Sequence, residues 1–171
     1  DCLDRLSVDY VDLLYAVHWP AGEYDSETTF DAVGDLAGEG LFDRLGVCNM
    51  TPANLDEARE ASELPIDVLQ IEMHPLLPQR DLQSYCNLRD IDMVAYAPLG
   101  NGRMLDVPEL EEIADSHGVS PARVSVRWAM EKGTVPIPKA TSREHIVDNL
   151  RARELELTDD EIRRIDEIDR N

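Results

Sequence analysis

Short apolar runs that alternate with helix-like segments are the feature that most constrains how this 171-residue chain can fold. The first run, LLYAV at residues 13–17, lies within segment 9–19, is too short for a core helix and is followed by Pro20. Such a run is typical of a buried parallel strand. Similar runs follow at residues 44–48, 66–71, 91–95 and 134–137. The sequence therefore predicts five strands.

Segments with helical spacing lie between and after these runs, at residues 29–39, 51–62, 80–89, 108–116, 121–131 and 143–150. Thr51-Pro52 and Ser120-Pro121 are typical helix starts, as is Thr158, which precedes three acidic residues. A final helix is indicated at residues 157–170, where isoleucines recur at helical spacing. Alternating strands and helices predict a parallel sheet covered by helices, either open or closed into a barrel.

The glycine pattern favours the barrel. No G-x-G-x-x-G follows any predicted strand, and the glycines at residues 99–102 open no matching helix. A (β/α)8 barrel typically needs about 250 residues, so five strands in 171 residues leave it three units short. We therefore expect one α/β domain over residues 1–171, an incomplete TIM-type barrel with about five of eight parallel βα units plus a C-terminal helix.

The composition narrows the classes of partner. Acidic residues number 36 against 16 basic ones, a net charge of −20, and hydrophobic residues make up 43%, too many for a disordered chain. Only Lys132 and Lys139 are lysines. Such a surface repels nucleic acids and anionic membranes. It suits a salt-rich, halophilic cytoplasm, where charge repulsion is screened; an ordinary acidic protein is the alternative.

Membrane, secretion and metal signals are weak. No apolar run approaches the roughly 20 residues of a membrane span, and the first residues resemble no signal peptide, so we expect a cytoplasmic protein. Three cysteines form no C-x-x-C pair. Glu72 and His74 alternate along a strand and its exit, a poor ligand set without further His or Cys, so we expect no metal.

Motifs at the predicted strand ends identify a family. The chain resembles the aldo-keto reductases in five segments, in family order and spacing: RLSVDYVDLLYAVHWP (5–20), RLGVCNMTPANLDEA (44–58), VLQIEMHPLLPQ (68–79), MVAYAPLGNG (93–102) and VPIPKATSREHIVDNL (135–150). The resemblance covers the family's last five βα units and its C-terminal helix. It implies a barrel that binds NADPH at the carboxyl ends of its strands and reduces small aldehydes or ketones.

The resemblance implies a catalytic role for His18. Hydride delivery to a carbonyl carbon builds negative charge on its oxygen, which hydrogen-bond donors stabilise. His18 matches the family's histidine that orients the carbonyl, and Trp19 beside it matches a wall of the substrate pocket. A structural histidine before a proline turn, and plain packing for Trp19, are the alternatives.

Further matches concern the nicotinamide. Asn49 and Gln70 match residues that hydrogen-bond its carboxamide, and Cys48 stands where the family usually has serine, as a weaker partner. Tyr96 matches the aromatic ring that stacks on the nicotinamide, a buried core tyrosine being its alternative. Leu99 and the following residues 100–103 match the stretch that passes over the pyrophosphate.

The last motif matches the adenosine end. Lys139 corresponds to the lysine that pairs with the ribose phosphate, where Thr141 adds a hydroxyl, and Asn149 corresponds to the adenine contact. His145 stands where the family commonly has an arginine, which weakens the preference for NADP; Arg143 could compensate. NADPH is the first choice of cofactor and NADH the alternative.

The family's tyrosine acid and its lysine and aspartate partners come from units that precede this sequence. The sequence begins at Asp1 without Met, inside what resembles the helix before the fourth strand, so we expect an incomplete gene product or a partial sequence. The rival hypothesis is a non-catalytic remnant or a nucleotide-binding interaction module. Oligomeric state stays open.

Overall fold

The computed structural model describes residues 2–18 and 24–168. All five predicted strands are present, with ends that differ by at most two residues from the predicted runs: β1 Val11–His18, β2 Phe42–Cys48, β3 Val68–Glu72, β4 Asp92–Tyr96 and β5 Val135–Ile137. Helices alternate with them: α1 Cys2–Leu6, α2 Ser26–Gly38, α3 Pro52–Ala61, α4 Arg80–Asn87, α5 Pro108–His117, α6 Pro121–Glu131, α7 Arg143–Arg151 and α8 Asp159–Asp166. Two 3₁₀ segments, η1 Gly100–Asp106 and η2 Ala152–Glu154, were not predicted.

The helix starts follow the predicted capping chemistry. The Thr51 hydroxyl accepts from the Asn54 amide at α3, and the Ser120 hydroxyl accepts from the Arg123 amide at α6. At α8, Thr158 and Glu161 form a reciprocal capping box. These side chains satisfy backbone N–H groups that a first helical turn leaves without partners.

The chain divides into two compact units. Unit 1 comprises residues 1–71 and 81–92, and unit 2 comprises residues 72–80 and 93–171. Each has its own buried side chains, such as Leu45, Leu55 and Leu69 in unit 1 and Leu110, Ile113 and Trp128 in unit 2. The expectation of one domain over residues 1–171 stays a prediction.

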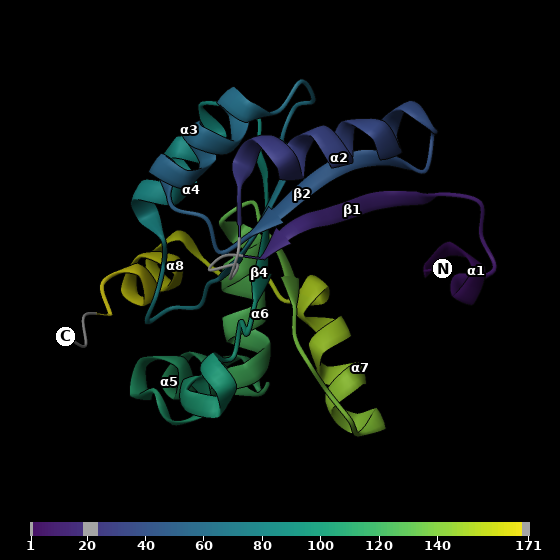
Figure 1. The fold of residues 1–171 in the computed structure, drawn as a ribbon. Helices are drawn as coiled ribbons and strands as arrows, with labels where there is room; N and C mark the ends of the chain where they lie inside the picture. Colours follow the sequence, from purple (N-terminus) through teal and green to yellow (C-terminus); the bar gives the residue numbers. More distant parts are fainter. Residues whose placement is uncertain (1, 19–23, 169–171) are drawn as a thin grey trace. The chain divides into compact units, whose positions relative to one another are not determined.

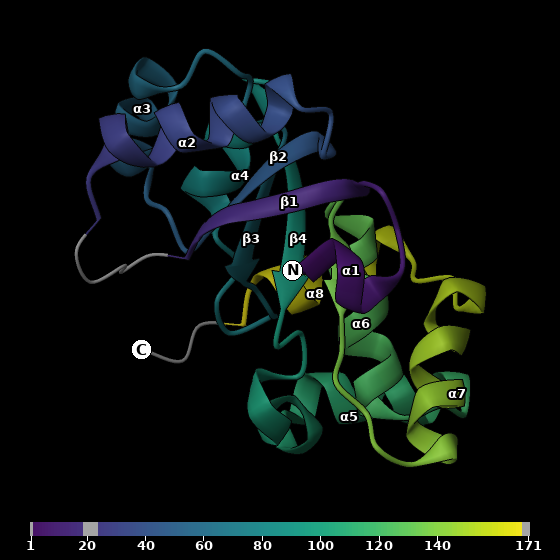
Figure 2. The same cartoon turned by 45° about the vertical axis from the view of Figure 1, so that its right-hand side comes forward.

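Unit 1 is built on a parallel ladder. β2 pairs with both β1 and β3, and helices α2 and α3 lie on the same side of β1 and β2 (Figure 2). The register aligns His18 with Cys48 and Cys48 with Gln70, so three of the predicted site residues form a row at the carboxyl ends. A register shift between Tyr15 and Val17 gives β1 one extra residue just before this row.

A hydrogen-bond network around Asp67 joins β2 to the starts of β3 and β4. Its Oδ2 accepts from the Leu45 amide at 2.8 Å, and its own amide donates to the Leu45 carbonyl at 2.8 Å. The Asp67 carbonyl accepts from the Asp92 amide at 2.9 Å, and the Arg44 guanidinium donates to the Asp92 carboxylate at 2.7 Å. The network fixes the strand starts relative to one another.

Unit 2 is organised around α6, which packs against α5, α7, η1, η2 and β5 (Figure 1). Trp128 of α6 is fully buried, and its indole N–H donates to the Asp166 carboxylate at 2.9 Å. The same carboxylate accepts from Lys132. Asp166 thereby joins α8 to α6. In this unit β4 and β5 pair in parallel.

Two of the strands are less buried than predicted. In β1 only Val17 is fully buried, and in β5 the side chains of Val135 and Ile137 are 58% and 45% exposed. Apolar composition predicted burial on both faces, but burial also requires a neighbour. Within the described residues β1 pairs with β2 alone and β5 with β4 alone, so one edge of each lacks a strand partner.

Asp67→Ala tests the network at the strand starts. We expect a loss of about 1–2 kcal/mol in the free energy of unfolding, because the Leu45 amide loses its side-chain acceptor. Urea denaturation measures this loss. Asp43→Ala removes an exposed carboxylate from β2 and serves as the control. Equal midpoints for the two variants would contradict the assigned role of Asp67.

Candidate functional site

A polar cluster lies at the carboxyl ends of β1, β2 and β3 in unit 1. The Asn49 Nδ2 lies 3.3 Å from the His18 Nε2, and the Asn49 amide donates to the Gln70 carbonyl at 2.9 Å. Asn49 has a positive φ of 58°, a conformation that asparagine tolerates better than most residues and that turns the chain sharply after β2. The fold thus brings His18, Cys48, Asn49 and Gln70 together at the carboxyl ends of these strands.

Cys48 differs from its neighbours in this cluster because it is buried, with 5% of its surface exposed. Burial raises the pKa of its thiol, so the group is a neutral S–H at pH 7. A neutral thiol is a weak donor and a weak acceptor. The remaining predicted residue of this region, Trp19, lies outside the described residues.

A second cluster lies in unit 2, around a cavity of about 100 Å³. Four predicted cofactor residues line it, together with three others: Leu99, Lys139, His145 and Asn149, with Leu105, Ala122 and Asp148. Whole-ligand pockets usually measure about 300–1,000 Å³. The cavity therefore fits one part of a larger ligand. Lys139 and His145 are exposed at its rim, where a cation meets incoming anions.

The carboxylate of Asp148 is held in place within unit 2. It accepts from the Ser120 hydroxyl and from the Arg123 guanidinium, whose Nε lies 3.0 Å from Oδ1. Both partners belong to the start of α6. Because α6 and α7 are tied here, the wall of the cavity is fixed before any ligand arrives.

Three other predicted residues do not line this cavity. Tyr96 ends β4 half-buried, and its carbonyl accepts from the Met73 amide at 3.2 Å. Thr141 is exposed. Arg143 lines a neighbouring hollow of about 730 Å³ together with His145, and it makes no ion pair within residues 2–18 and 24–168.

The loop after β4 has an unusual backbone. Ala97, Gly100, Asn101 and Gly102 all have positive φ, between 45° and 98°. The buried Ser125 hydroxyl of α6 donates to the Pro98 carbonyl at 2.7 Å and anchors the start of the loop. The sequence indicated this segment through its two glycines but not its shape.

Sequence reasoning missed Leu105 and Ala122 as lining residues of the cavity. Leu105 is a partly exposed apolar residue shortly after the glycine loop, and Ala122 follows the Ser120-Pro121 helix start. Their positions next to predicted motifs were the available signal. Only the packing of η1 and α7 against α6 brings them together.

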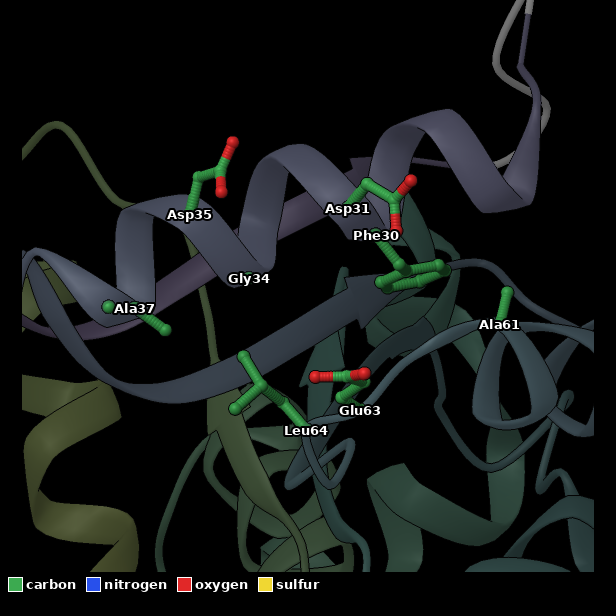
Figure 3. A pocket seen from close by; sticks show the side chains of 9 residues that line it. Phe30, Asp31, Gly34, Asp35, Ala37, Ala61, Glu63 and Leu64 are labelled. Atoms are coloured by element: carbon green, nitrogen blue, oxygen red, sulfur yellow. The ribbon is translucent and has the colours of Figure 1, made fainter.

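A larger hollow, about 750 Å³, lies in unit 1 between α2 and the segment before β3 (Figure 3). Asp31, Asp35 and Glu63 line it beside Phe30 and Leu64, and none of its lining residues is basic. Three carboxylates repel the phosphates of a nucleotide. It contains no predicted site residue, so we do not assign the site to it.

The described residues show neither a metal-binding cluster nor a membrane-spanning helix. Within the described residues, no three His, Cys, Asp or Glu side chains are placed so that they could share a metal ion. Among the helices that the structure describes, none has both the length and the apolar character needed to cross a membrane.

Comparison with known proteins gives the family. The sequence pattern of the Aldo/keto reductase family matches residues 1–170. The uncharacterized oxidoreductase YtbE of Bacillus subtilis is 36% identical over 170 residues, 99% of this chain and 60% of that protein. The glyoxal reductase of Bacillus subtilis is 35% identical over 169 residues, again 99% and 60%.

Comparison with a solved structure gives the same family. The aldo-keto reductase MGS-M4, from a Medee basin deep-sea metagenome library, superposes with a TM-score of 0.90 at 30% identity over 98% of this chain and 62% of its own. The five strands and their helices thus correspond to part of a (β/α)8 barrel, and this sequence spans about 60% of the length of the curated relatives it matches. The chain belongs to the aldo/keto reductase family.

Proposed function

We propose that this chain carries the carbonyl-orienting histidine and most of the dinucleotide-binding residues of an NAD(P)H-dependent reductase of aldehydes or ketones. The observation that carries the proposal is the gathering of predicted residues into two clusters, one in each unit. Family membership and relatives named as reductases support the reaction class.

The cluster in unit 1 suits the nicotinamide carboxamide. Asn49 and Gln70 offer amide donors and acceptors that complement the donor and acceptor of the carboxamide. When bound, the reduced nicotinamide supplies the hydride. The thiol of Cys48 adds less to this recognition than the usual serine hydroxyl would, so Asn49 and Gln70 do most of the holding.

His18 acts on the substrate oxygen. The Asn49 Nδ2 lies 3.3 Å from the His18 Nε2, and Nε2 carries no proton when it accepts from that side-chain amide. Once Asn49 turns to the carboxamide, the His18 Nε2 is released and can carry the proton that it presents to the substrate carbonyl. A hydrogen bond there stabilises the charge that develops on that oxygen.

The cavity in unit 2 suits the adenosine end. Lys139 and His145 stand at its rim, and Asn149 and the apolar Leu99 and Leu105 also line it. A ribose phosphate is an anion and pairs with Lys139, while the apolar side chains suit the faces of a purine. His145 lacks the bidentate fork of an arginine, so the grip on that phosphate depends on Lys139.

Nucleotide binding is the property to test first. Titration of this chain with NADPH, followed by nicotinamide fluorescence in molar KCl to screen the charge of −20, gives a dissociation constant. The mass of the natural protein is measured in parallel. Absence of any NADPH binding by a folded sample would overturn the proposal and leave the non-catalytic alternative.

Lys139→Gln is expected to weaken NADPH binding about tenfold and to leave NADH binding within about twofold, because only NADPH carries the ribose phosphate. Fluorescence titration with each nucleotide measures the ratio. Arg153→Gln removes the same charge from the same unit outside the cavity and is the control. Equal losses for both nucleotides would contradict the role of Lys139.

His145→Arg is expected to strengthen NADPH binding by roughly three- to tenfold, with little change for NADH. An arginine is fully charged at pH 7 and provides a planar, bidentate donor for phosphate. The same titration checks the prediction. An unchanged ratio of the two dissociation constants would show that position 145 does not face the phosphate.

A further inference from the structure

A carboxylate, an imidazole and a guanidinium meet at the end of β3 in unit 2. The His74 Nε2 lies 3.4 Å from the Glu72 Oε1 and 3.5 Å from the Arg103 Nη2, and that Nη2 lies 3.7 Å from the same Glu72 oxygen. Arg103 belongs to η1, 29 residues after His74. We call the three residues Glu72, His74 and Arg103 the loop anchor.

His74 is the buried part of the anchor, with 1% of its surface exposed. Its Nδ1 has no hydrogen-bond partner among the described residues. Burial lowers the pKa of His74, which outweighs the opposite effect of Glu72, so the ring is neutral at pH 7. A buried polar atom without a partner is costly. The Nε2 of the neutral ring either donates to Glu72 or accepts from Arg103, and one of these contacts is what the ring gains there.

The glycine loop rests directly on this ring. A Cβ added at Gly100 would lie 3.1 Å from the Met104 Cε and 3.4 Å from two atoms of the His74 ring. Gly100 has a φ of +52°, so a side chain would also strain the backbone. The Arg103 Nε donates to the Gly100 carbonyl at 3.0 Å. Gly100 is therefore held by the hydrogen bond from Arg103 and packs closely against the His74 ring.

Hydrogen bonds also hold the backbone of residues 72 and 73. The Gln79 side chain donates to the Glu72 carbonyl at 2.9 Å, and the Met73 amide donates to the Tyr96 carbonyl at 3.2 Å. Glu72 thus projects from a tied backbone. Its side chain is 29% exposed against 63% for Arg103, so the carboxylate is the more buried of the two charges.

We propose that Glu72 and Arg103 are positioning residues that hold the glycine loop at residues 99–103 in the shape that binds the pyrophosphate of the dinucleotide. The inference rests on the proposed function for its ligand. Both charged side chains act on the conformation of the loop, and neither contacts the phosphates directly.

The direction in which Glu72→Gln changes the affinity for NADPH tests this proposal. Glu72→Gln removes a negative charge close to the loop, so simple electrostatics predicts tighter binding of an anionic ligand. If Glu72 positions the loop, NADPH binding is instead weakened roughly fivefold, about the contribution of a partly exposed ion pair. Adenosine 2′,5′-bisphosphate, which has no pyrophosphate, should bind within about twofold of the original chain.

Two further variants complete the set. Glu112→Gln removes one carboxylate from an Arg–Glu pair elsewhere in unit 2, Arg164 with Glu112, and controls for net charge. Arg103→Lys keeps the charge but loses the bond from Nε to the Gly100 carbonyl, so it should weaken NADPH in the same direction. It also provides a test if Glu72→Gln fails to fold.

Hydrogen exchange separates the two proposals. We expect the amides of residues 99–105 to exchange several-fold faster in Glu72→Gln and Arg103→Lys than in Glu112→Gln, in the absence of nucleotide. Unchanged exchange, or tighter NADPH binding by Glu72→Gln, would overturn the anchor. If the original chain binds neither NADPH nor the bisphosphate, the proposed function fails and the exchange rates alone decide about the anchor.

Discussion

The register of the parallel ladder in unit 1 is the constraint on which the candidate site depends. Side chains of a strand alternate between faces, so a slip of one residue would turn His18, Cys48 and Gln70 away from their shared side. The hydrogen bonds around Asp67 secure the amino ends of β2 and of the segments before β3 and β4. These bonds lie away from the carboxyl ends of the strands, where His18, Cys48 and Gln70 lie.

The basic residues that the structure describes in unit 2 include both ion-paired and unpaired side chains. Several basic residues of unit 2 form ion pairs, as Arg123 does with Asp148, Arg127 with Glu131 and Lys132 with Asp166. Lys139 and Arg143 make no ion pair within residues 2–18 and 24–168, although acidic residues outnumber basic ones by 36 to 16 in the chain. A chain of charge −20 repels anions at long range, and two unpaired cations beside a cavity offset that repulsion locally.

Much of this arrangement could be predicted from the sequence. Short apolar runs and capping residues located the strands and helices to within a few residues, because both depend on local chemistry. The exposure of β1 and β5 could not be predicted, because burial depends on which other segments cover a strand. The loop anchor could not be predicted from the sequence for a similar reason. Glu72 and His74 lie close together in the sequence, where they indicated only a poor metal-ligand set, and Arg103 joins them only through the fold.

The close fit between Gly46 and Tyr15 has a consequence for how this sequence can change. The two residues are aligned across β1 and β2, and a Cβ added at Gly46 would lie 2.6 Å from the Tyr15 ring. Alanine at position 46 is therefore accessible only after Tyr15 has become smaller, whereas the reverse order passes through a clashing intermediate. The two positions are epistatic, and homologous sequences should exchange these residues together.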